Sequence, residues 1–213
     1  MIIETLTVGS FQVNNYLVVS DDKDAVLIDA GGDYEATKKV IDKYNANIKC
    51  ILNTHAHMDH IAGDYDIQTK LGAKILINKD DEFLFNCFED HLKMFGMPYY
   101  KTPKADQYIV DGQEIKIGSL SFKVIATPGH SPGSVCFLIG NILFSGDTLF
   151  ADTVGRTDLP GGSYEELGDS VKNKLFTLDE SVVVYPGHGE STTIKHEKYF
   201  NPCFGLKSSS NQF

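Results

Sequence analysis

The sequence contains 213 residues, of which 42% are hydrophobic and 23% are charged, a composition typical of a globular protein with a sizeable core. The formal net charge of -10 at pH 7 argues against a surface that binds nucleic-acid phosphates, because such surfaces gather Lys and Arg. An anionic small-molecule partner stays open, since bound divalent cations would reverse the local field.

The N-terminal stretch MIIETLTVGSFQVNN has no basic start and no long apolar run, so we predict no signal peptide. No segment reaches the ~20 apolar residues of a membrane span. The four cysteines form no CxxC pair and are predicted to be reduced thiols: Cys50, Cys87, Cys136 and Cys203. We therefore expect a cytoplasmic protein without a membrane partner, of undetermined oligomeric state.

Apolar runs bounded by Gly, Asp, Asn or Pro predict strands in two groups. The first group comprises IIETLTV, NYLVV, AVLIDA, KCILNTH and AKILIN, and the second comprises EIKIG, LSFKVIATPGH, SVCFLIG, NILFSGDT and SVVVYPGHG. Helical periodicity predicts helices over Tyr34 to Tyr44, Ala62 to Leu71, Asp80 to Phe95 and Tyr164 to Leu175. Two strand groups interleaved with helices predict two sheets packed face to face with helices outside. We expect one domain over residues 1–206 and a disordered tail over residues 207–213.

Three histidines and an aspartate crowd the stretch NTHAHMDH, directly after the strand KCILN. His55 and His57 are two residues apart, so they point to the same side of an extended chain. Asp59 and His60 follow at the turn into the next helix. A helix N-cap and solvated imidazoles are the plainer alternative, but four metal-type side chains within six residues favour a divalent-metal site.

Three more ligand-type side chains follow predicted strands later in the chain. His130 ends TPGH, Asp147 lies in LFSGDT, and His188 lies in YPGHG. Each comes after a strand and a glycine turn, where functional side chains often lie. Taken singly, a Gly-His turn or a helix-capping Asp would explain them; together with the first cluster they predict the remaining metal ligands.

The set HAHMDH, TPGH, SGD and PGHG resembles the signature of the metallo-β-lactamase-fold hydrolases, over residues 14–202. The segments GRTDLPGGS and HEKYFNP further resemble the glyoxalase II (hydroxyacylglutathione hydrolase) group, particularly its short single-domain branch. This resemblance implies a four-layer αβ/βα sandwich of the α+β class. It also implies two divalent ions, with zinc expected and with iron or manganese also compatible with His and Asp ligands.

The resemblance implies a role for each ligand residue. One ion would be bound by His55, His57 and His130; the other would be bound by Asp59, His60 and His188. Asp147 would bridge the two ions and hold a shared water. Asp59 would serve as a secondary proton acceptor if one ion were missing.

Such a pair of ions, roughly 3.5 Å apart, would lower the pKa of the shared water to near neutrality. The resulting hydroxide would attack an acyl carbonyl while one ion stabilises the oxyanion. The resemblance implies a thioester substrate, S-lactoylglutathione or a similar acyl thiol. Only 25 residues follow His188, too few for the helical domain that binds glutathione in longer relatives, so the physiological acyl thiol is undetermined.

Other residues near these motifs allow more than one interpretation. Arg156 could pair with a substrate carboxylate, but a structural pair with Asp158 is favoured. The segment Cys87 to Tyr100 is interpreted as a helix covering the core, with a substrate-side lid as the alternative. His91 and His196 are interpreted as surface or supporting histidines, and His196 as a cap of the C-terminal turn.

A persulfide dioxygenase of the same fold is the main alternative function, with a single iron on His57, His130 and Asp147. The sequence LPGGS after GRTD and the PGHG motif are closer to the hydrolase branch. The acidic balance disfavours a nucleic-acid-processing relative. The complete ligand set disfavours a non-catalytic binding module, and the absence of a secretion signal disfavours a β-lactamase.

Overall fold

The computed structural model describes residues 1–207. The predicted disordered tail therefore lies outside the described residues, except for Lys207. By their internal contacts the residues form two compact units. Unit 1 comprises Met1–Ile109 and Ile115–Ser121, and unit 2 comprises Val110–Glu114 and the residues from Phe122 onward. No helix in the described part of the chain is long and apolar enough to span a membrane.

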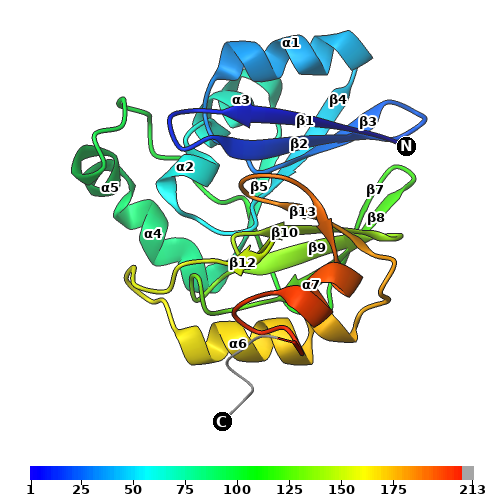
Figure 1. The fold of residues 1–213 in the computed structure, drawn as a ribbon. Coiled ribbons are helices and arrows are strands. Elements are labelled where there is room, and N and C mark those ends of the chain that lie inside the picture. The colour runs from blue at the N-terminus through cyan, green and yellow to red at the C-terminus, as the bar shows by residue number, and fades with distance from the viewer. Residues whose placement is uncertain (208–213) are drawn as a thin grey trace. The chain divides into compact units, whose positions relative to one another are not determined.

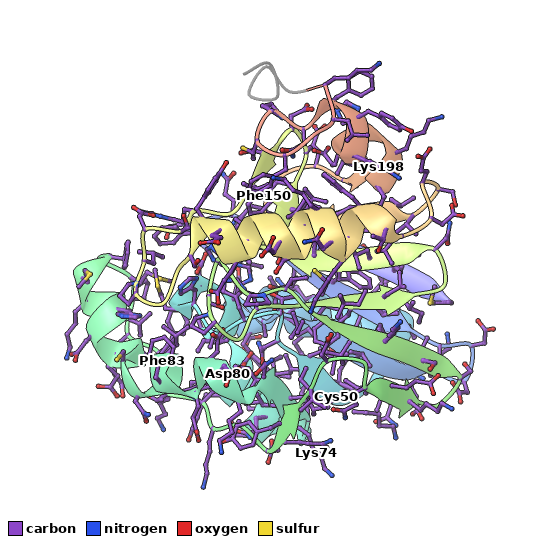
Figure 2. All side chains as sticks on the ribbon, turned by 90° about the horizontal axis from the view of Figure 1, so that it is seen from below. Cys50, Lys74, Asp80, Phe83, Phe150 and Lys198 are labelled. Atoms are coloured by element: carbon purple, nitrogen blue, oxygen red, sulfur yellow. The ribbon has the colours of Figure 1, made fainter. Side chains whose placement is uncertain are left out.

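Unit 1 contains a six-stranded sheet in the order β1-β2-β3-β4-β5-β6. Its strands are β1 (Ile2–Val8), β2 (Val13–Val19), β3 (Asp24–Ile28), β4 (Asn47–Leu52), β5 (Lys74–Asn78) and β6 (Gln107–Ile109). The first three strands pair antiparallel, and β3 to β6 pair parallel. Cys50 of β4 and Lys74 of β5 are partners in this parallel register (Figure 2). Because parallel strands share one carboxyl edge, the residues that follow β3 and β4 lie at the same edge of the sheet.

The helices of unit 1 pack against one face of this sheet, as α1 and α3 show in Figure 1. They are α1 (Tyr34–Tyr44), α2 (Met58–Ile61), α3 (Asp64–Leu71), the 3-10 turn η1 (Lys79–Asp81), α4 (Glu82–Asn86) and α5 (Phe88–Met94). The prediction for α1 is confirmed: the Asp33 side chain caps its start, and Asn45 ends it in the left-handed conformation. The predicted helix over Asp80 to Phe95 is instead broken at Cys87.

Unit 2 is built around the second sheet, whose order is β14-β13-β10-β9-β8-β7. Its strands are β7 (Glu114–Ile117), β8 (Leu120–Ala126), β9 (Val135–Ile139), β10 (Ile142–Gly146), β13 (Val183–Pro186) and β14 (Thr192–Thr193). Residues of the β7–β8 hairpin belong to both units. β10 pairs parallel with β13 and antiparallel with β9, and β9 pairs antiparallel with β8. Strands β8, β10 and β13 therefore run in the same direction.

One face of the second sheet is covered by helices, which Figure 1 shows as α6 and α7. The helices are α6 (Tyr164–Asn173), the 3-10 turn η2 (Leu175–Thr177) and α7 (Ile194–Phe200), and a small hairpin joins β11 (Leu149–Phe150) to β12 (Thr153–Val154). Leu167 and Val171 of α6 and Ile194 of α7 are fully buried in the same hydrophobic cluster. The loops that follow β8, β10 and β13 carry three of the predicted ligands.

Candidate metal centre

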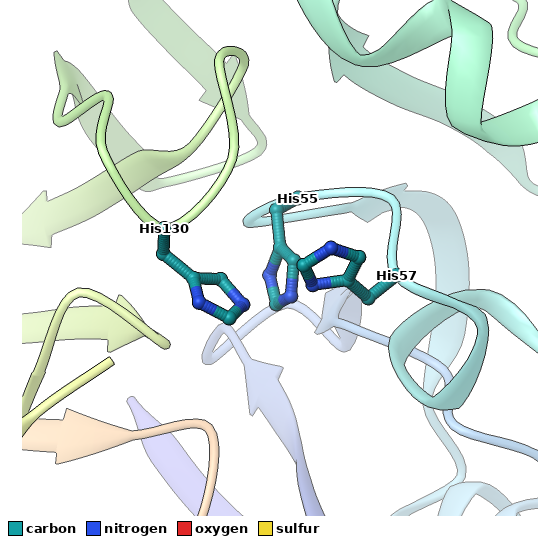
Figure 3. Close-up of side chains that lie close together, drawn as sticks. All are labelled: His55, His57 and His130. Carbon is teal, nitrogen blue, oxygen red and sulfur yellow. The ribbon is translucent and has the colours of Figure 1, made fainter. Parts of the chain in front are cut away.

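The four ligand residues predicted first in the chain lie together in unit 1. His55 and His57 extend from the loop between β4 and α2 (Figure 3), and Asp59 and His60 lie in α2. The ring centroids of His55 and His57 are 4.8 Å apart, and those of His55 and His60 are 4.1 Å apart. Nε2 of His60 lies 3.8 Å from the Asp59 carboxylate. All four residues are buried, so the side chains converge instead of being solvated.

Asp29 is a functional residue that the sequence analysis missed. It follows β3, is buried, and accepts hydrogen bonds from the backbone N–H and the hydroxyl of Thr54 and from Nδ1 of His60, at 2.8, 2.9 and 2.9 Å. Because a carboxylate only accepts, the proton of His60 lies on Nδ1 and the lone pair on Nε2. The signal in the sequence was an Asp directly after a strand, a position that it shares with Asp147.

The tautomer of His55 is fixed by its neighbour Thr54. The Thr54 hydroxyl donates to Asp29, and its oxygen lies 3.1 Å from Nδ1 of His55. The single hydroxyl proton is already used, so Nδ1 of His55 is the donor and Nε2 carries the lone pair. The loop itself is held by Asp81, a buried residue that accepts from the backbone N–H of Ala56 at 3.0 Å.

The other three predicted ligands lie together in unit 2. His130, Asp147 and His188 follow β8, β10 and β13, three strands that end at the same edge of the sheet. Nε2 of His130 and Nε2 of His188 each lie 3.6 Å from the same oxygen of Asp147, Oδ2. A carboxylate oxygen equidistant from two imidazole nitrogens is suited to sharing cations with both rings.

The loop after Asp147 fixes the tautomer of a third imidazole, that of His130. Nδ1 of His130, drawn in Figure 3, lies 2.7 Å from the carbonyl oxygen of Arg156. A carbonyl only accepts, so Nδ1 is protonated and Nε2 carries the lone pair. The adjacent Gly155 allows this approach, because a Cβ there would lie 1.9 Å from the carbonyl oxygen of Asp147 and 3.1 Å from Nδ1 of His130. His55, His60 and His130 thus present the tautomer that metal ligation requires.

The Arg156 side chain forms the pair that the structural interpretation predicted. Its Nε and Nη2 donate to the two carboxylate oxygens of Asp158 at 2.6 and 2.7 Å. This bidentate contact lowers the pKa of Asp158 to about 2. Both residues are exposed. A substrate contact of Arg156 stays a prediction.

The segment Cys87 to Tyr100 covers the core, since Phe88 and Leu92 of α5 are buried. It also presents Met94 and Tyr99 to solvent, at 75% and 69% exposure, and the preceding helix α4 carries the exposed Phe83 (Figure 2).

The interpretation of His196 as a C-terminal cap is wrong. Its backbone N–H donates to the Thr193 side chain in the first turn of α7, and its Nε2 pairs with Asp152 at 2.7 Å. The other histidine outside the ligand pattern, His91, is half-buried in α5.

Comparisons with known proteins show the family of the chain. The family model for the metallo-β-lactamase superfamily matches residues 8–188. The hydroxyacylglutathione hydrolase GloC of Haemophilus influenzae is 35% identical over 212 residues, which cover 98% of this chain and all of that protein.

Several crystal structures have the same fold. The B3 metallo-β-lactamase BLEG-1 has a TM-score of 0.88 at 35% identity, covering 94% of this chain and 98% of that one. TTHA1623 in a di-iron-bound form has a TM-score of 0.86 at 33% identity, covering 93% and 98%. ETHE1 from Myxococcus xanthus has a TM-score of 0.83 at 28% identity, covering 98% and 86%. The chain therefore belongs to the metallo-β-lactamase superfamily and has its αβ/βα fold.

Proposed function

We propose that the protein is a metal-dependent hydrolase that cleaves the thioester of a small acyl thiol, of which S-lactoylglutathione is the model substrate. The observation that carries this proposal is the position of Asp147, one oxygen of which lies 3.6 Å from Nε2 of both His130 and His188. The similarity to a hydroxyacylglutathione hydrolase over nearly the whole chain supports the choice of a thioester.

The proposed ligand set is the one expected from the sequence. The cluster of unit 1 would give His55 and His57 to one ion, and Asp59 and His60 to the other. The cluster of unit 2 would complete both shells, with His130 for the first ion, His188 for the second and Asp147 for both. The donor chemistry fits, because imidazole nitrogens and carboxylates are the ligands that zinc, iron and manganese accept.

Zinc is the proposed metal, and iron is the alternative that the similar di-iron protein supports. When bound, the ions would supply an activated water and a Lewis acid for the acyl carbonyl. The protein's own contribution is orientation: Asp29, Thr54 and the carbonyl of Arg156 each fix one imidazole. Asp59 is the proposed acceptor for a proton if only one ion is present.

We further propose that the protein acts in the cytoplasm on a small molecule and not on nucleic acid. All four cysteines are free thiols, as a reducing compartment favours. Burial raises the pKa of Cys50 to about 12 and that of Cys136 to about 11. These two thiols are therefore inert in the folded protein, and neither serves as a nucleophile.

The test is thioester hydrolysis by protein that has been stripped with a chelator and then reloaded with zinc. We expect loss of S-lactoylglutathione only after reloading, and loss of that activity in Asp147→Asn. The matched control is Asp169→Asn, an exposed carboxylate on α6, which should keep full activity. A reloaded protein with its full metal content that cleaves no simple thioester would show that the substrate class is wrong.

An iron-dependent persulfide dioxygenase is the second candidate, with His57, His130 and Asp147 as ligands. The segment GRTD, Gly155 to Asp158, resembles a loop of the persulfide dioxygenases, and the similar TTHA1623 structure contains iron. Both observations favour a test of this second candidate. It predicts one iron per chain and oxygen uptake with glutathione persulfide. Iron-loaded protein that consumes no oxygen with this substrate would exclude it.

A further inference from the structure

The β11–β12 hairpin contacts or adjoins all three ligand residues of unit 2. It begins two residues after Asp147. The ring of Phe150 in β11 lies 6.3 Å from the ring of His188. The residues that follow β12 hold His130, through the carbonyl of Arg156. The position of this hairpin therefore affects the relative placement of the three side chains.

The turn of the hairpin is tied to α7 through a buried carboxylate. Glu197 is fully buried, and both of its oxygens lie 3.2 Å from the backbone nitrogen of Asp152. Asn201 donates from Nδ2 to Glu197 at 2.7 Å and to the carbonyl of Thr153 at 3.1 Å. Thr192 donates its hydroxyl to Glu197 at 2.6 Å. Figure 2 marks Phe150 on the hairpin and Lys198, the next residue of α7.

A buried carboxylate that accepts from several donors is a strong anchor, since charge-assisted hydrogen bonds are short and costly to lose. The contact between the side chains of His196 and Asp152 involves two exposed groups, so it stabilises the hairpin less than the buried Glu197 does. Asp152 has a left-handed backbone, with φ at 59°, a conformation that the hydrogen bonds from its N–H to Glu197 help to hold.

We propose that Glu197 is a positioning residue for the metal ligands of unit 2, acting through the β11–β12 hairpin. The inference rests on the proposed function only in taking His130, Asp147 and His188 as ligands. A glutamine at position 197 would keep the shape of the side chain but lose its charge, and it would turn a donor toward groups that themselves donate. The hairpin would then be held less firmly, and the three ligands with it.

The test is metal affinity, measured by competition with a chelator, on the full chain. We expect Glu197→Gln to bind metal roughly 10–100-fold more weakly than the wild type. Excess metal should restore kcat with KM unchanged. Thr192→Val, which removes one donor to Glu197, should shift the affinity in the same direction by less and covers the case in which Glu197→Gln does not fold.

The matched control is Glu180→Gln. Glu180 also binds α7, accepting from the hydroxyl of Tyr199 at 3.1 Å and pairing with Nζ of Lys198 at 3.5 Å, and both of these contacts lie away from the hairpin. The Glu180→Gln variant should therefore have a lower melting temperature but an unchanged metal affinity. Asp152→Asn keeps the backbone donor and should likewise keep the affinity.

Unchanged metal affinity in both Glu197→Gln and Thr192→Val would overturn the inference and leave Glu197 a purely structural residue. A wild type that binds no ions would overturn it together with the proposed function. A wild type that binds ions but cleaves no thioester would contradict the proposed function alone. Because Asp152, His196 and Glu197 offer ligand atoms within 4.8 Å of one another, a third ion per chain that only Glu197→Gln removes would also overturn the positioning role.

Discussion

Asp29 lies at the end of β3 with three donors around its carboxylate, two from Thr54 and one from His60. Its φ of 57° places it in the left-handed region, which Asp and Asn tolerate better than most residues. The residue therefore combines two roles. It holds the loop that follows β4, and it sets the proton of one imidazole so that Nε2 can act as a ligand.

We predict that Asp29→Asn weakens metal binding by roughly 10–100-fold, with little change in the backbone. The amide tolerates the left-handed conformation but lacks the charge that favours the proton on Nδ1 of His60. Isothermal titration of the stripped protein with zinc measures the effect. Wild-type affinity in the variant would show that the orientation of His60 does not depend on Asp29.

Asp64 is another buried carboxylate, and it has few hydrogen-bond donors around it. Asn53 donates to one oxygen at 3.4 Å, and no described residue hydrogen-bonds to the other, Oδ2. Burial raises the pKa of Asp64 well above its ordinary value of 3.8. Because the folded-state pKa is raised, the group destabilises the folded protein increasingly as pH rises above 3.8.

We therefore predict that Asp64→Asn raises the melting temperature of the metal-free protein at pH 7 and has little effect near pH 4. The neutral amide removes the cost of burying a carboxylate and can still hydrogen-bond. Thermal unfolding followed at both pH values gives the answer. A lower melting temperature of the variant at pH 7 would mean that the ionised carboxylate is stabilised in the fold.

At the scale of elements, helical periodicity predicted α1 to the residue, and the structure shows that local caps, Asp33 and Asn45, set both of its ends. The same periodicity failed to predict the break between α4 and α5. Cys87, where the break occurs, is neither Gly nor Pro and gives no local signal. Each short helix buries its own apolar residues, including Phe85 and Phe88, so the break is set by tertiary packing.

The β11–β12 hairpin was not predicted as a separate element. Its strands have two residues each, too short for a period-2 pattern to be recognised. Its turn depends on Asp152 in the left-handed conformation, which the buried Glu197 and the exposed His196 support from 45 and 44 residues further along the chain. Contacts at such separation leave no mark in the local sequence.

The ion pair between this hairpin and α7 gives a pH-dependent prediction. The hydrogen bond to Asp152 raises the pKa of His196 above its ordinary value of 6.5, and the nearby charge of Glu197 adds to the effect. The pair therefore contributes its full stability below pH 6.5 and loses it as pH rises through the raised pKa.

Asp152→Asn should lower the melting temperature at pH 5.5 by at most roughly 4 °C, since an exposed pair contributes about 1 kcal/mol or less. At pH 9 the wild type and the variant should unfold at the same temperature. Differential scanning calorimetry at the two pH values measures this. An equal difference in melting temperature at both pH values would show that the charge on His196 is not involved.

At the scale of the whole molecule, the sequence placed five of the seven proposed ligands after the ends of strands, and Asp59 and His60 at the turn into the next helix, which is α2. For the later ligands that was possible because strand, glycine turn and ligand follow one another locally, as in TPGH, which ends at His130, and SGD, which ends at Asp147. The pairing of each imidazole with the acceptor that fixes its tautomer, such as His60 with Asp29, could not be predicted. The acceptors come from other strands and loops, and only tertiary packing brings them to the rings.

The resemblance to the metallo-β-lactamase fold, expected over residues 14–202, is confirmed by the family match over residues 8–188. A single domain over residues 1–206 stays a prediction. The assignment of seven ligands to one pair of ions is the central claim, because both the hydrolysis and the role of Glu197 depend on it.

The most direct test is a crystal structure of the zinc-loaded protein, with anomalous scattering recorded at the zinc edge. We predict two anomalous peaks per chain, one bound by His55, His57 and His130, the other by Asp59, His60 and His188, with Asp147 contacting both. Peaks elsewhere in the molecule, or seven side chains that do not share ions, would contradict the account.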